Sequence, residues 1–345
     1  MIIPEGGIMV IRKANSIYKI AELAGVSPAT VSKVINGRHD VSEKMCHKVR
    51  KIMQEQEYKP SVSKTGMDTI GVFIPLSTGA RLSNPYLAGI VSGIGDTAGD
   101  SDLTVSIVNS DRIPKNPQEF VRFCRMRRIS GGIFPLLNLQ DDYLAAIAHV
   151  FPTVTLSRDY GREIAGCVMA DNYNGGYEAA KYLVSMGHRK ILLVNPSVRY
   201  PDHNFRIKGA MMAIEESGLR NTVMKFDNSL EFEDTDLGYR MDSLLTGTCR
   251  PTAIFAASDQ EALRIIRLLG ERNIAIPEDI SIVGFDDLYF AANMNPPLTT
   301  VRQPLYNMGR EACTIITQMI KKKPEASVLK VFPIELILRK SVKNI

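Results

Sequence analysis

The sequence lacks the features that mark membrane, secreted and disulfide-linked proteins. No apolar run approaches the roughly 18–20 residues of a membrane-spanning helix. Its five cysteines are odd in number, far apart and form no Cys-x-x-Cys pair, which favours reduced thiols over a disulfide framework or a zinc site. The first residues have no basic segment ahead of an apolar run, which argues against a signal peptide. We therefore expect a cytoplasmic protein.

Recognisable catalytic chemistry is also missing. The sequence contains no nucleophile elbow, no P-loop and no cluster of metal-ligand residues. The segment Gly93–Ala98 formally matches a dinucleotide-binding fingerprint, but Leu87, Ile90 and Ile94 form a helical apolar stripe that runs into it. Since the fingerprint requires a tight turn directly after a strand, we interpret this segment as part of a helix. We expect no enzymatic activity, no cofactor and no metal.

The charge of the chain is concentrated at one end. Residues 1–66 contain eleven Lys or Arg and six Asp or Glu, whereas the other 279 residues carry 31 charges of each sign. A length of 345 residues exceeds one compact domain and predicts two or three. A basic segment on a neutral body indicates that the first domain alone has a polyanionic partner.

Residues 16–37 have the pattern of two short helices joined by a tight turn. Ser16 and Ser27 can cap the two helices, Pro28 suits the first position of the second, and Gly25 supplies the turn. Apolar residues recur on one face of each helix, and polar residues remain on the outer face of the second. Such a motif places one helix in the major groove of DNA, although a helical hairpin within an ordinary core has the same pattern.

The boundaries of this first domain follow from helix and linker signals. A third helix is predicted over 42–57, and Pro60 ends it because a residue before proline is pushed out of the helical region. We expect a helix-turn-helix DNA-binding domain over 15–60 and a short polar linker over 61–68.

Short apolar runs alternate with amphipathic stretches after residue 69, which is typical of parallel strands covered by helices on both faces. The predicted strands cover 70–74, 103–108, 132–134, 153–156, 167–169, 191–194, 253–256, 280–284 and 331–338. The predicted helices cover 84–99, 117–128, 140–149, 173–186, 205–217, 236–246, 259–272 and 305–321. There are enough units for two sheets, which favours two lobes with a ligand cleft between them.

We therefore predict an α/β protein, with an N-terminal all-α head and a core of doubly wound parallel sheets over 69–345. Lobe 1 is expected at about 69–170 and 304–327, and lobe 2 at about 171–301 and 328–345. No coiled-coil tail follows the last strand, so we expect a dimer and not a tetramer joined through such a tail.

A series of motifs occurs in one order along the chain: IAELAGVSPATVSKVING, Tyr58-Lys59-Pro60, Asn84-Pro85-Tyr86, GHRKI at 187–191, PTAIFAASDQEAL at 251–263, IPEDISIVGFDD at 276–287 and PPLTTVRQP at 296–304. Over essentially its whole length the sequence resembles the lactose/galactose repressor (LacI/GalR) family of bacterial transcription regulators. The resemblance implies a helix-turn-helix head, a hinge, and a two-lobed core similar to periplasmic sugar-binding proteins.

The resemblance also implies which residues face DNA. Pro28, Ala29 and Lys33 stand at the family's base-reading positions, where Lys33 can donate to guanine and Ala29 can contact a thymine methyl. The remaining DNA-facing residues, which lie against the groove or reach the backbone, are Ile17, Tyr18, Ser27, Thr30, Ser32 and Asn36. For Tyr18, simple surface packing is the alternative.

A cleft between the lobes is implied in the same way. Its expected lining consists of Tyr86, Leu87, Ser157, Arg158, Arg206, Phe232, Ser258, Asp259 and Asp286. Arg206 and Asp286 can form bidentate hydrogen bonds to a sugar or nucleobase, and Phe232 or Tyr86 can supply an aromatic face. Asp286 also suits a strand-end cap, and Asp259 suits the N-cap of the helix that follows it.

Three departures from the family's pattern stand out. The linker is short and contains no leucine to wedge into the minor groove, which leaves Val62 as the aliphatic substitute. The segment 76–83 is longer than is typical and adds Arg81. Ser157 and Ser258 replace the Asp and Asn of many relatives, so the identity of the ligand does not transfer.

The function that the resemblance implies is a homodimeric transcription factor, most simply a repressor of carbohydrate-utilisation genes, that binds a roughly palindromic operator. A small carbohydrate ligand between the lobes would control operator affinity. The chain would then be bacterial and associated with the nucleoid when bound to DNA. Two alternatives remain: a core that senses a partner protein, and a solute-binding protein without a regulatory role.

Overall fold

The computed structural model describes residues 17–35, 41–56, 69–75, 83–136, 141–156, 166–195, 200–219, 234–246, 250–321 and 328–345. The chain divides into two compact units, residues 1–67, here called the head, and residues 68–345, here called the core. None of the helices that the structure describes is long and apolar enough to cross a bilayer.

The described part of the head consists of the predicted helices α1 (Ile17–Ala24), α2 (Pro28–Ile35) and α3 (Glu43–Glu55). Gly25 adopts a left-handed φ of +67° in the turn between α1 and α2, a conformation that side chains with a Cβ disfavour. The hydrophobic interior of the head consists of Ile20, Ala21, Ala24, Val31, Val34 and Val49. The three-helix head predicted from the capping and apolar pattern is therefore confirmed.

The core contains two sheets, and each defines one lobe. The sheet of lobe 1 is wholly parallel, with the strand order β10-β5-β4-β3-β1-β2. Its strands are β1 (Thr69–Ile74), β2 (Thr104–Asn109), β3 (Ile129–Phe134), β4 (Thr153–Leu156), β5 (Gly166–Ala170) and β10 (Leu329–Phe332). The sheet of lobe 2 has the order β11-β9-β8-β7-β6 and is parallel except for β11. Its strands are β6 (Ile191–Val194), β7 (Ala253–Ala256), β8 (Ser281–Asp286), β9 (Thr299–Arg302) and β11 (Glu335–Ile337).

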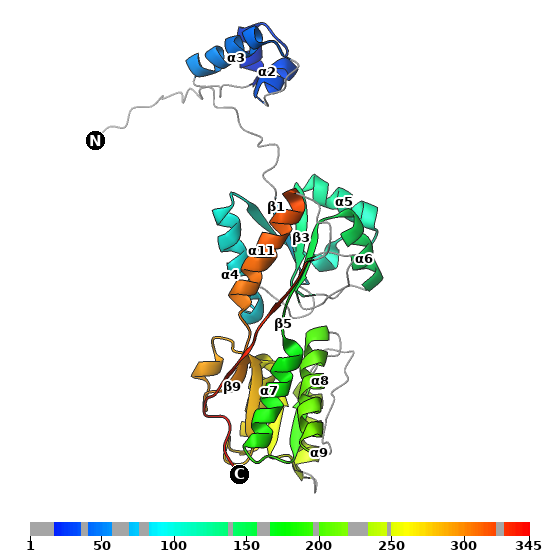
Figure 1. Cartoon of the computed structure of the whole chain (residues 1–345), viewed down its shortest axis with the longest axis vertical. Helices are drawn as coiled ribbons and strands as arrows, with labels where there is room; N and C mark the ends of the chain where they lie inside the picture. The colour runs from blue at the N-terminus through cyan, green and yellow to red at the C-terminus, as the bar shows by residue number, and fades with distance from the viewer. Residues whose placement is uncertain are drawn as a thin grey trace, which may run out of the picture. The chain divides into compact units, whose positions relative to one another are not determined.

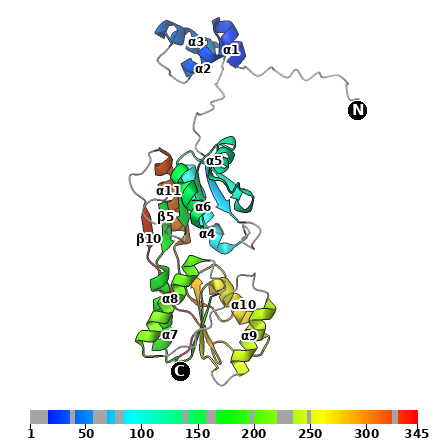
Figure 2. The ribbon, with the colours of Figure 1, turned by 90° about the vertical axis from the view of Figure 1, so that its right-hand side faces the viewer.

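Helices cover both faces of each sheet, so the doubly wound α/β arrangement is confirmed (Figures 1 and 2). In lobe 1, α4 (Pro85–Asp100) and α11 (Leu305–Lys321) cover one face, and α5 (Pro117–Met126) and α6 (Asp141–Val150) cover the other. In lobe 2, α7 (Asn172–Ser185) and α8 (Pro201–Glu216) lie opposite α9 (Asp234–Thr246) and α10 (Asp259–Gly270). Short 3-10 turns cover Ser110–Arg112 and Ala291–Asn293.

The end of the chain differs from the prediction. The expected strand over 331–338 is two strands in different lobes, because β10 pairs with β5 whereas β11 pairs with β9. Pro333 separates them, since it has no N–H with which to continue a ladder. Residues 328–332 therefore belong to lobe 1 and not, as expected, to lobe 2. Strand β9 was not predicted, although its sequence Thr-Thr-Val-Arg is rich in β-branched residues.

The chain crosses from one lobe to the other at three short segments, here called the first, second and third passages. The first is at Asp171, between β5 and α7, and the second is at 303–304, between β9 and α11. The third is at 333–334, between β10 and β11. The first and third are joined by a hydrogen bond from the Asp171 N–H to the carbonyl of Phe332.

Two glycines permit an exceptionally close contact between α7 and α8. A Cβ on Gly176 would lie 1.8 Å from the carbonyl oxygen of Arg206, and one on Gly209 would lie 1.9 Å from that of Tyr173. Both obstacles are backbone atoms, so a side chain at either position must push the helices apart. Because the obstacle at Gly176 is the backbone of Arg206, this contact limits how far Arg206 can lie from α7.

Gly209→Ala is therefore expected to destabilise the core by about 1–3 kcal/mol, as overpacked cores do. Thermal and urea unfolding of the full chain measure the effect. Gly95→Ala is the matched control, because a Cβ there meets nothing within 4 Å in the exposed face of α4. That change should stabilise the chain by about 0.5–1 kcal/mol, the usual gain of a helical alanine over glycine. Equal stability of the two variants would contradict the packing argument.

Candidate functional site

The outer surface of the head contains most of the residues predicted to face DNA. Tyr18 is 72% exposed, and Ala29 and Lys33 are exposed along α2. Pro28 and Ser32 are half-buried. Ile17 begins α1, but its side chain lies outside the described residues, as do Asn36 and Val62 altogether.

Ser27 caps α2, as the sequence predicted. Its hydroxyl oxygen accepts a hydrogen bond from the Thr30 N–H at 3.1 Å, and the two hydroxyl groups lie 2.9 Å apart. Pro28 follows at the first helical position, where a missing N–H costs nothing. The same two hydroxyl groups therefore stabilise the helix start and face outward from it.

A cavity of about 220 Å³ lies between the lobes of the core. Its lining combines side chains from the loops after parallel strands and from the first turns of helices. These residues are Asn84, Tyr86, Leu136, Tyr200, Asp202, His203, Arg206, Ser258, Gln260 and Asp286. The carboxyl ends of parallel strands are where α/β folds place ligands.

Arg206 is the most completely held residue of the cavity. Only 1% of its surface is exposed. Its Nε donates to Asn172 Oδ1 at 2.8 Å, and its terminal nitrogen donates to the Ala257 carbonyl at 2.6 Å and to Asp286 Oδ1 at 3.1 Å. The guanidinium also lies 3.9 Å from the centre of the Phe285 ring. The charge is thus balanced and its planar group fixed before any ligand enters.

Asp286 connects the cavity to a passage between the lobes. Its Oδ1 accepts from Arg206 and, at 2.6 Å, from the Gln303 side-chain amide. Gln303 stands directly after β9, where the chain leaves lobe 2. Burial raises the pKa of Asp286, whereas Arg206 and the Gln303 hydrogen bond favour its ionised form.

Burial also shifts the pKa values of two other groups in the cavity lining, Tyr86 and His203. Burial raises the pKa of the Tyr86 hydroxyl, and Asp202 raises it further, so this phenol remains protonated. Burial lowers the pKa of His203 from 6.5 to about 4, against the attraction of Asp202 and together with the repulsion of Arg206. The imidazole is therefore neutral at physiological pH.

Of the predicted lining residues, Tyr86, Arg206, Ser258 and Asp286 meet at this cavity. Ser157, Arg158 and Phe232 lie outside the described residues. Leu87 does not line the cavity: it is fully buried in the lobe 1 core, because the next residue of a helix points about 100° away from Tyr86.

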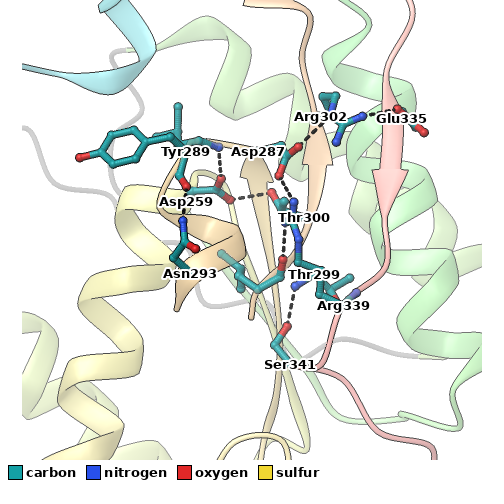
Figure 3. A network of polar contacts seen from close by, with 12 residues as sticks. Asp259, Asp287, Tyr289, Asn293, Thr299, Thr300, Arg302, Glu335, Arg339 and Ser341 are labelled. Atoms are coloured by element: carbon teal, nitrogen blue, oxygen red, sulfur yellow. Dashed lines mark hydrogen bonds and ion pairs between the residues drawn. The ribbon is translucent and has the colours of Figure 1, made fainter. Parts of the chain in front are cut away.

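Asp259 is not among the residues that line the cavity, and it is not the N-cap of α10. The N-cap of α10 is Ser258, whose side chain accepts from the Glu261 N–H. Asp259 is fully buried and accepts from the Leu288 N–H at 2.8 Å and from the Thr300 hydroxyl at 2.6 Å. It thereby ties the loop after β8 to β9 (Figure 3).

Sequence reasoning missed six lining residues: Asn84, Leu136, Tyr200, Asp202, His203 and Gln260. A usable signal existed, because each follows a strand or begins a helix at the edge where the carboxyl ends of the strands lie. Asn84 was noted for its motif, and it caps α4 by accepting from the Tyr86 N–H at 3.0 Å.

Comparison with known proteins gives the same division of the chain. Residues 16–61 match the family described as bacterial regulatory proteins, lacI family. Residues 180–342 match the periplasmic binding protein-like domain. Among solved structures, the complex of transcriptional regulator CelR with cellobiose has a TM-score of 0.67 and 27% identity, covering 95% of this chain and 99% of CelR.

Two curated relatives match along nearly their full length. The HTH-type transcriptional regulator DegA of Bacillus subtilis (strain 168) is 31% identical over 334 residues, which cover 95% of this chain and 98% of DegA. The HTH-type transcriptional repressor PurR of Vibrio atlanticus (strain LGP32) is 30% identical over 339 residues, covering 96% of this chain and 99% of PurR. With its helix-turn-helix head and two-lobed core, this chain belongs to the LacI family of bacterial transcriptional regulators.

Proposed function

We propose that this regulator is a homodimeric repressor whose affinity for a roughly palindromic operator is controlled by a small carbohydrate bound between the core lobes. The observation that carries the proposal is the cavity built around Arg206 and Asp286. The same chain contains a head of the DNA-binding type. Membership of the LacI family accounts for the DNA-binding head and the two-lobed core. The cavity is the place where a ligand would control DNA binding.

The carbohydrate class is supported by the cavity and by one relative. Carbohydrate hydroxyl groups suit fixed bidentate donors and acceptors such as Arg206 and Asp286, and Tyr86 adds an aromatic surface. A cavity of about 220 Å³ is smaller than the 300–1,000 Å³ that is usual for drug-sized ligands, which favours a compact molecule. The structural relative CelR was solved with cellobiose.

The strained turn after β8 offers a route from the cavity to the passages between the lobes. Asp286 and Asp287 have positive φ values of 116° and 52°, which residues with a side chain adopt at a cost of about 1–3 kcal/mol each. Asp287 accepts from Arg302 at 2.7 Å and from Arg339 at 2.6 Å (Figure 3). Arg302 ends β9, just before the second passage.

A ligand that contacts Asp286 would therefore alter a turn that holds two passages at once. Arg302 also donates to Glu335 of β11, directly after the third passage, at 2.9 Å (Figure 3). A ligand can shift the arrangement of the lobes only by the difference in its affinity for two arrangements. The Asp286–Asp287 turn is where that difference would arise.

The shortness of the recognition helix α2 supports a dimeric state. The eight residues of α2 can contact only a few base pairs. Two heads related by a twofold axis double that contact and match a palindromic site. The repressor role is supported by the name of the Vibrio atlanticus relative.

Lys33→Ala is expected to weaken binding to the preferred DNA by about 1–3 kcal/mol and to relax the preference at one base pair. Selection from a random DNA pool with the full chain supplies the preferred sequence, and titration of single-base variants measures the effect. Lys208→Ala, on α8 of the core, is the control for loss of one charge. Uniform weakening on all sequences would make Lys33 a phosphate contact instead.

The proposal as a whole is tested by measuring affinity for the selected DNA with and without compounds that raise the thermal midpoint of the chain. Sugars, sugar phosphates and nucleobases form the set, since a ligand specific to the native state raises apparent stability. A sugar should change the DNA affinity, and Asp286→Ala should abolish that change while DNA binding persists. If DNA affinity responds only to an added protein fraction, the core senses a protein partner.

His203→Gln is expected to reduce the pH dependence of stability. Between pH 4 and 6.5 the unfolded chain binds a proton at this histidine that the folded chain excludes. Its contribution is therefore complete above pH 6.5 and is lost as pH falls toward 4, a change of roughly 1–3 kcal/mol. Thermal unfolding of both chains across this range measures it, and parallel curves would contradict burial of a neutral imidazole.

A further inference from the structure

Two buried polar atoms in the described part of the cavity wall have no hydrogen-bond partner. Within the part of the chain that the structure describes, Asp202 Oδ1 and His203 Nδ1 are buried and have no hydrogen-bond partner. Only 6% of the Asp202 surface is exposed. Its other oxygen, Oδ2, lies 3.6 Å from Arg206 as an ion pair. A buried polar atom without a partner costs free energy, so such atoms mark a place where a ligand can supply the missing bond.

The two residues are neighbours in the first turn of α8. They follow Pro201, and the N-cap Tyr200 makes no side-chain capping bond. An open helix N-terminus commonly binds an anion. Here the carboxylate of Asp202 lies in the first turn of α8. The positive end of the helix dipole therefore already faces a negative charge of the protein.

The charge of the described wall also disfavours an anion. The lining contains two carboxyl groups, Asp202 and Asp286, against the single guanidinium of Arg206. Because the pKa of His203 is lowered, its imidazole is neutral and adds no compensating positive charge. A phosphate or carboxylate group would meet acceptor oxygens where donors are needed.

Hydroxyl and ammonium groups fit both free atoms. A carboxylate oxygen only accepts, so Asp202 Oδ1 requires a donor. The free Nδ1 of a neutral imidazole donates in one tautomer and accepts in the other, and a hydroxyl group can meet either one. Two neighbouring hydroxyl groups, or an amine beside a hydroxyl, satisfy the pair.

We propose that Asp202 and His203 form a subsite that selects an uncharged or amino sugar and rejects sugar phosphates and sugar acids, with a donor of the ligand bonded to Asp202 Oδ1 and a hydroxyl group to His203 Nδ1. This inference rests on the proposed carbohydrate-binding role of the cavity. It adds the charge class of the ligand and names the two protein atoms, Asp202 Oδ1 and His203 Nδ1, that select it.

The test compares ribose with ribose 5-phosphate, and glucose with glucosamine and glucose 6-phosphate. Thermal midpoints of the full chain are measured over a concentration series of each compound. At least one uncharged or amino sugar should stabilise the chain, and its phosphate should not. Asp202→Asn should weaken that sugar's affinity about tenfold or more, because the amide replaces one acceptor by a donor. His203→Phe, which retains a ring, should weaken it as well.

Asp100→Asn is the matched control, since this exposed carboxylate ends α4 and does not line the cavity. It should leave the sugar's affinity unchanged. Stabilisation by a phosphate, unchanged affinity in Asp202→Asn, or indifference of the wild-type chain to every uncharged and amino sugar would overturn the inference. If a sugar binds through Asp202 but does not alter DNA affinity, the subsite stands and the regulatory proposal fails.

Discussion

The buried guanidinium of Arg206 is the interaction on which the rest of the core depends. It ties α8 to Asn172 at the start of α7, to the loop after β7 and to the end of β8. Removing one partner from such a buried cation leaves an unbalanced charge, which typically costs 3–5 kcal/mol. Gly176 of α7 faces the backbone of Arg206, so the close packing of α7 against α8 meets the site at this residue.

The same carboxylate that balances Arg206 also holds the passage between the lobes. Asp286 accepts from Arg206 on the cavity side and from Gln303 on the side of the second passage. Asp287, the next residue, holds Arg302 and Arg339. Because both aspartates have left-handed backbone conformations, the turn has few ways to relax without moving these partners. We infer that binding in the cavity and the lobe arrangement share this turn.

Much of the fold could be predicted because its signals are local. Residues 153–156, 191–194 and 253–256 are short apolar runs between helices, and the structure gives strands with those bounds. Strands β9, β10 and β11 were missed or merged because their pairing depends on partners far away in the sequence. Asp202 was missed because an acidic residue in the first turn of a helix looks solvated in the sequence, whereas the fold leaves only 6% of its surface exposed.

Hydrogen–deuterium exchange of the full chain, with and without the sugar that stabilises it most, tests the central claim directly. If the Asp286–Asp287 turn couples the cavity to the lobes, protection should change at 302–305 and 334–336 as well as in α8, and Gln303→Leu should remove the change at 302–305 while binding persists. A change confined to the cavity wall, with both passages unaffected, would contradict this coupling.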